Sequence, residues 1–73
     1  MNLRPALFYQ HLQDTPASVW TVQHNLHDYP IIDVFVDEAG VMTKIIPAEI
    51  TYIDGVTATI TFSFAIAGVA QVG

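Results

Sequence analysis

The sequence contains no cysteine, which excludes disulfide bonds and thiolate metal sites and leaves the redox compartment open. It is also poor in charge, because Asp, Glu, Lys and Arg make up 12% of its 73 residues, against roughly 25% in an average domain. Arg4 and Lys44 are its two basic residues, and the net charge is −5. Since a phosphate backbone is bound by several clustered cations, we expect no nucleic-acid partner.

Charge is absent altogether from residues 55–73, a stretch nearly long enough to cross a bilayer as a helix. Threonine or serine occupies every second position from Thr57 to Ser63, however, and this is the rhythm of a strand. The first residues lack a basic segment followed by an apolar core, so they do not predict a secretory signal. We therefore expect no membrane partner.

Apolar side chains are abundant, at 52% of the chain. A chain of this length is predicted to form one domain, residues 1–73, and to bury only about 60% of its unfolded surface. Without disulfides, oligomerisation is the remaining way to stabilise so small a domain. Because so few charges cannot cover the surface, some apolar surface is expected to be buried against neighbouring molecules. We predict a homo-oligomer or repeated copies, with residues 1–5 either an N-terminal arm that holds a neighbouring subunit or a frayed terminus.

Apolar and polar positions alternate along the chain, and no stretch keeps a helical period. Hairpins are expected at residues 37–40, where Gly40 can be left-handed, and at Asp54-Gly55. Turns are expected at residues 13–16 and 65–68. The predicted fold is all-β, a small antiparallel β-sandwich (Ig-like or barrel-like) of six or seven short strands. The strands are expected at residues 6–12 (or a short helix there), 19–24, 31–36, 41–46, 49–53, 56–63 and 69–72.

Several short motifs follow one another in a fixed order. They are an amide and small-residue turn at 13–18, W-x-V-x-H-N-L at 20–26, Pro30, D-x-x-G at 37–40, P-x-x-x-x-Y-x-D-G at 47–55, I-T-F-S at 60–63 and A-x-x-G-x-A at 65–70. This order resembles a small β-sandwich module of tailed-bacteriophage virion structural proteins, which occurs at the ends of tail or fibre proteins and as short independent proteins. The resemblance covers residues 8–72 and implies adhesion and assembly.

The resemblance implies a virion location and contacts with other virion proteins, as a capsid decoration, tail, baseplate or connector subunit. The alternative is a receptor- or carbohydrate-binding tip of a tail fibre, which would use exposed aromatic residues such as Tyr9, Tyr29 or Tyr52 beside Asp and Asn side chains. No group of polar residues predicts an enzyme, and no enzymatic activity accompanies the resemblance.

Histidine is the one residue type that suggests a metal site. His24 and His27 are three apart, Asp28 is adjacent, and His11 lies elsewhere, a set that in principle holds zinc. That spacing puts two ligands on one face of a helix, whereas His24 ends a predicted strand. We expect His24 to hydrogen-bond a loop, with Asn25 capping the turn, and we expect no metal, cofactor or catalytic residue.

Aromatic residues supply the candidate contacts. Trp20 shares a face with Val22 and is predicted to lie in the core. Phe35 lies on the same side of its strand as Asp33, where an exposed ring would anchor an interface. The alternative is that Phe35 packs under the N-terminal segment. The candidate interface residues are Arg4, Phe8, Tyr9, Phe35 and Phe64.

Overall fold

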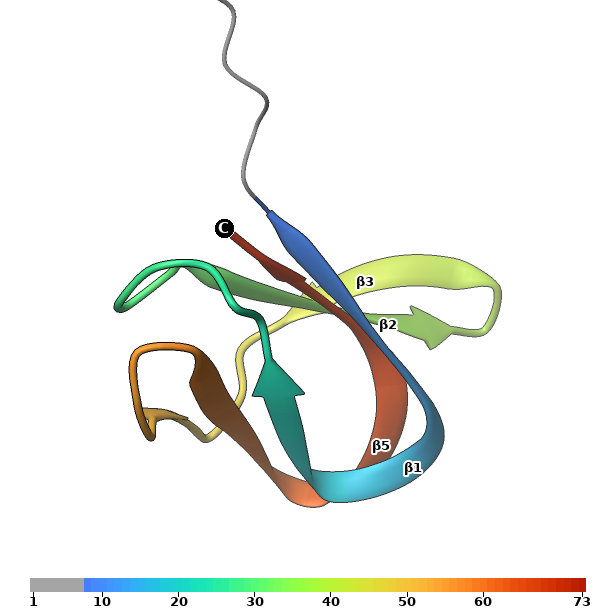
Figure 1. Ribbon diagram of the computed structural model, residues 1–73. Coiled ribbons are helices and arrows are strands. Elements are labelled where there is room, and N and C mark those ends of the chain that lie inside the picture. The colour runs from blue at the N-terminus through green and yellow to red at the C-terminus, as the bar shows by residue number, and fades with distance from the viewer. Residues whose placement is uncertain (1–7) are drawn as a thin grey trace, which may run out of the picture.

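The chain folds into one antiparallel sheet of five strands (Figure 1). The computed structural model describes residues 8–73, and this part contains no helix long and apolar enough to cross a membrane. The all-β prediction is confirmed, whereas a sandwich of six or seven strands is not. The strands are β1 (Tyr9–Gln23), β2 (Ile32–Glu38), β3 (Val41–Ile45), β4 (Glu49–Tyr52) and β5 (Thr57–Val72).

The strand count differs from the prediction because β1 and β5 are each one long strand. β1 joins the predicted strands at 6–12 and 19–24, and β5 joins those at 56–63 and 69–72. The expected turns at 13–16 and 65–68 are therefore wrong, because these residues continue the strands as bends. The chain does not reverse direction at either segment.

The bend has a visible cause in the pairing of β1 with β5. The register shifts between Gln13 and Ala17 and again between Ala17 and Val19, and such irregularities bend a strand and increase its twist. The indole Nε1 of Trp20 lies at this corner and donates to the carbonyl oxygens of Ala17 (3.1 Å) and Ile66 (3.0 Å). One side chain thus ties the two bent strands together.

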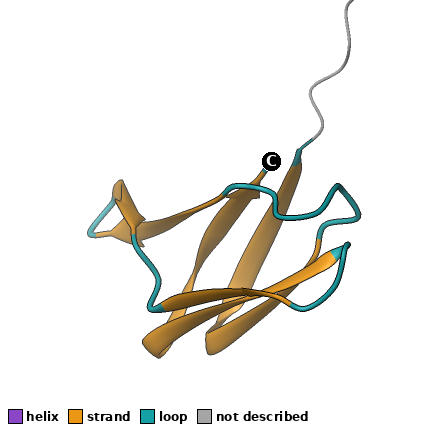
Figure 2. Cartoon of the chain, turned by 90° about the vertical axis from the view of Figure 1, so that its left-hand side faces the viewer, coloured by secondary structure: helices purple, strands orange, loops and turns teal. Residues whose placement is uncertain are grey.

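β5 is the central strand. Its first half lies between β1 and β4, its second half lies between β1 and β2, and β3 extends the sheet beyond β2. The sheet curls so that these two halves cover each other across the core (Figure 2). The buried apolar residues come from both halves and form one cluster: Trp20, Val22, Ile32, Val34, Val36, Ala58, Ile60, Phe62, Ala70 and Val72.

Both predicted hairpins are present. β2 and β3 are joined by Ala39 and Gly40, whose φ angles of 53° and 86° are those of the two-residue turn that matches strand twist. The amide of Gly40 donates to Oδ1 of Asp37 at 2.8 Å. β4 and β5 pair from Tyr52 opposite Ala58, so their connection is longer than the two residues of the Asp-Gly signal.

Candidate functional site

The side of the sheet that faces away from the core carries the most distinctive surface. We call this side of β1, β5, β2 and β3 the outer face. Residues paired across antiparallel strands point to the same side, so the register assigns its members. They are an apolar row of Leu12, Val69 and Phe35, a polar row of Gln10, Gln71 and Asp33, and the pair of Asp37 and Met42.

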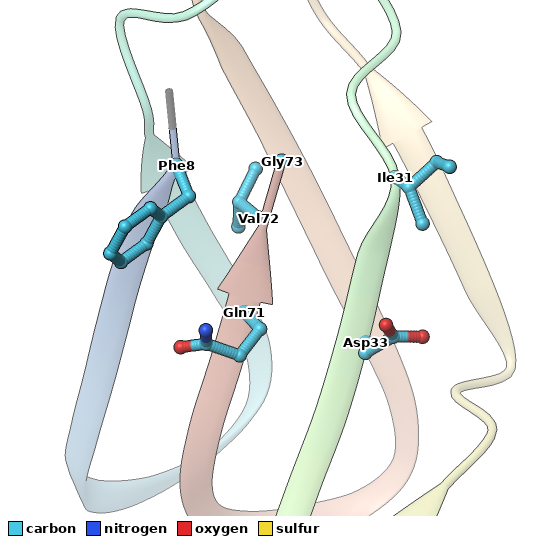
Figure 3. Close-up of a pocket in the computed structure, with 6 residues that line it drawn as sticks. All are labelled: Phe8, Ile31, Asp33, Gln71, Val72 and Gly73. Carbon is cyan, nitrogen blue, oxygen red and sulfur yellow. The ribbon is translucent and has the colours of Figure 1, made fainter. Parts of the chain in front are cut away.

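A shallow pocket of about 210 Å³ lies at the end of the outer face where β1 begins and β5 ends. Figure 3 shows Phe8 on one side of it, Gln71 in the middle and Ile31 with Asp33 on the other side. Phe8 and Ile31 are exposed, and the side-chain oxygen of Gln71 is buried without a hydrogen-bond partner among the described residues. This end offers apolar walls and one unused acceptor.

A larger groove, of about 340 Å³, lies at the opposite end of the same face. Its apolar lining comes from Leu12, Met42 and Val69, and Leu12 and Met42 are about 60% exposed. Asp14 of β1 and Asp37 of β2 contribute carboxylates to the lining. The groove therefore combines apolar side chains with negative charge.

Charge on the described surface is almost entirely negative. All seven acidic residues lie within residues 8–73, which hold a single lysine or arginine, Lys44. Lys44 Nζ lies 3.1 Å from Oδ1 of Asp33 on the outer face, and because both side chains are exposed the pair adds little stability. The surface therefore suits a partner that brings positive charge.

The structure places the candidate interface residues on different parts of the surface. Phe8 and Phe35 both lie on the outer face, Phe8 exposed and Phe35 half-buried beside Val69. Tyr9 pairs with the core residue Val72 and points to the other side of the sheet. Phe64 is exposed at the bend of β5. Arg4 lies outside the described residues, as does the arm predicted at residues 1–5.

Leu12 and Met42 belong to the outer face but were missed by the sequence prediction. Leu12 shares the alternation of Phe8 and Gln10, which was the available signal on β1. Met42 is assigned to the outer face only by its pairing with Asp37, which depends on the register of the hairpin.

The motif between Trp20 and Pro30 is part of the interior. Trp20, Val22, His24 and Pro30 are buried, which confirms the prediction for Trp20. Nδ1 of His24 accepts a hydrogen bond from the amide of Leu26 at 3.0 Å, as expected of a residue that closes a strand. This bond places the proton of the neutral ring on Nε2, which is buried without a partner among the described residues.

Asn25 supports the same turn with a φ of 56°, a left-handed conformation that asparagine tolerates well. In residues 8–73 no three His, Asp or Glu side chains are grouped so that they could hold a metal ion. The motif forms the end of β1 and most of the loop that leads to β2.

Two tyrosines pack together at the end of this motif, Tyr29 from the loop before β2 and Tyr52 from the end of β4. The rings of Tyr29 and Tyr52 meet edge to face with centroids 5.4 Å apart, and the Tyr52 hydroxyl donates to the Pro30 carbonyl at 2.7 Å. Tyr29 is 75% exposed and has a φ of 56°, a strained conformation for tyrosine.

In the loop between β4 and β5, the amide of Val56 donates a hydrogen bond to the Asp54 carboxylate and thereby lowers the pKa of that carboxyl.

Comparisons of this chain with protein families, with curated proteins and with solved structures found no match.

Proposed function

We propose that this chain is a structural subunit of a bacteriophage virion that assembles through protein–protein contacts, in repeated copies. The outer face carries the assembly part of the proposal. Its apolar row includes the exposed Leu12, while Met42 and Phe8 are exposed near it, and such a surface is suited to burial against another protein. The virion location in this proposal is supported by the resemblance of residues 8–72 to the phage modules. In this proposal the curled sheet corresponds to the small β-sandwich of the phage modules.

Mass spectrometry of gradient-purified phage particles tests this function. We expect the chain in the particles at several copies each, as a capsid decoration, tail, baseplate or connector subunit. Absence of the chain from purified particles, or a soluble monomer with measurable enzymatic turnover, would contradict the proposal.

Two phenylalanines provide a matched comparison for the surface. Phe8 and Phe64 are 61% and 64% exposed, but only Phe8 lies on the outer face. We expect Phe8→Ser to reduce incorporation into particles and Phe64→Ser to leave it unchanged, with both variants folded by circular dichroism. The reverse order would move the interface from the outer face to the bend of β5.

A receptor- or carbohydrate-binding tip is the second candidate. The exposed Tyr29 ring, held against Tyr52 on a strained backbone with Asp28 adjacent, favours it, since aromatic faces and carboxylates are common in sugar sites. Phe64, an exposed aromatic residue in β5, serves as the control. Glycan-array binding that is lost in Tyr29→Ala and kept in Phe64→Ala would support this function.

A further inference from the structure

The lining of the groove at the Leu12 end of the outer face indicates what kind of ligand would fit it. Leu12, Met42 and Val69 offer apolar contacts, and Asp14 and Asp37 add two carboxylates. One oxygen of Asp37 accepts the Gly40 amide, and no lysine or arginine of residues 8–73 lies in the lining. The complementary ligand is a short segment with apolar side chains and one cation.

The chain itself contains such a segment. Lys44 already pairs with Asp33, so Arg4 is the remaining cation of the sequence. Its neighbours Leu3, Pro5, Ala6 and Leu7 are all apolar. We propose that residues 3–7 of a second copy of this chain bind in the groove, with the Arg4 guanidinium between the two carboxylates. This inference rests on the proposed assembly function and names the partner of one surface.

Pro5 favours the groove over the edge of the sheet. Strand addition at an exposed edge needs backbone N–H donors, and proline lacks one. Proline also favours an extended conformation for itself and for the residue before it, here Arg4. An extended segment with little conformational freedom to lose is suited to lie across an apolar groove.

Chain length assigns the segment to a second copy. Arg4 precedes Phe8 by four residues, so a fully extended chain moves it at most about 14 Å from Phe8. Asp14 lies six residues beyond Phe8, or about 20 Å along the strand. Because β1 runs from Phe8 towards the groove, the segment would also have to reverse, which uses several of the same residues.

A segment of one copy in the groove of the next is a head-to-tail contact. Such contacts close into rings when the rotation permits and otherwise form open chains. Every copy then uses one arm and one groove, so repeated copies follow from a single type of contact.

Exchange of charges tests the contact. Self-association of the full chain is measured by sedimentation velocity and native mass spectrometry over a range of concentrations. We expect Arg4→Glu and Asp14→Lys each to weaken self-association by about tenfold or more, because each places like charges together. An equimolar mixture of the two variants should recover association. The new glutamate in the arm of one variant then meets the new lysine in the groove of the other, and the native pair forms at the alternate contacts.

Two matched controls separate this contact from general effects. Glu49→Lys makes the same change of charge on exposed β4, away from the groove, and should leave association unchanged. Met42→Ser removes an apolar wall and should weaken association, whereas Val41→Ser, at a similarly exposed site on the other side of β3, should not.

A wild-type chain that stays monomeric, or self-association that neither Arg4→Glu nor Asp14→Lys weakens, would overturn the arm-in-groove contact. Association that is lost in Met42→Ser but unaffected by either charge reversal would overturn it too, because another segment would then fill the groove. These outcomes leave the virion function standing if purified particles contain the chain. Self-association with the expected charge dependence, together with absence from particles, would contradict the virion function alone.

Discussion

At the scale of the residue, Gly68 shows most clearly how close packing limits substitution. A Cβ atom added at Gly68 would lie 2.5 Å from the Phe35 carbonyl oxygen and 3.2 Å from the Trp20 ring. We expect Gly68→Ala to lower the free energy of unfolding by about 1–3 kcal/mol, because a backbone atom cannot move aside cheaply. Urea denaturation followed by Trp20 fluorescence measures this change.

Gly55 is the matched control for Gly68. A Cβ atom there would approach only a side-chain oxygen of Asp28, at 2.7 Å, and that flexible side chain can rotate away. Gly55→Ala should therefore change the free energy of unfolding by less than about 0.5 kcal/mol. Equal losses at the two glycines would show that the close approach of β2 to Gly68 is not limiting.

Asp54 links one side chain to the pH dependence of stability. Its pKa lies below the ordinary value of 3.8, chiefly because the Val56 amide donates to the carboxylate. Its contribution to stability is therefore fully present above pH 3.8 and is lost as the pH falls through the lowered pKa. We expect Asp54→Asn to be less stable than the wild type at pH 7 and the difference to shrink at pH 3. An unchanged difference would contradict this role.

At the scale of the element, the β2–β3 hairpin carries a local strain. Ala39 has a φ of 53°, a conformation that disfavours residues with a Cβ, whereas asparagine accepts it more readily. We expect Ala39→Asn to raise the free energy of unfolding by about 0.5–1 kcal/mol.

The opposite change in the same turn is the control. Gly40→Ala meets no atom within 4 Å, so its expected loss of about 1 kcal/mol comes from the backbone at φ 86° alone. Thermal unfolding of the two variants should therefore shift in opposite directions. Shifts of the same sign would argue against the two-residue turn.

The strands also show how far the sequence predicts an element. Alternation put Phe35 on the same side of its strand as Asp33, and in the structure the intervening residues Ile32, Val34 and Val36 face the core. The corner of β1 and β5 was not predicted, because the same residues favour a turn or a bend. In the structure the Trp20 indole joins the two strands at this bend, because it donates hydrogen bonds to a carbonyl group of each.

At the scale of the whole molecule, the longest strands pair across nearly the full sequence. Tyr9 lies opposite Val72, and such non-local pairing slows folding. A circular permutant that joins residue 73 to residue 8 by a short turn, and opens the chain between Ile46 and Pro47, makes β5 and β1 a hairpin and keeps the other two hairpins intact. We expect it to fold about tenfold faster in stopped-flow measurements. Equal or slower folding would contradict the importance of this pairing.

The sequence by itself determined the all-β class of the fold, the two hairpins and the place of Trp20 in the core. These features depend on alternation and turn chemistry, which act between near neighbours. The tertiary structure alone decided that the chain has five strands rather than six or seven, and that Leu12, Val69, Phe35 and Met42 share one face. The physical reason is register: pairing between segments far apart in the chain sets which outward side chains become neighbours.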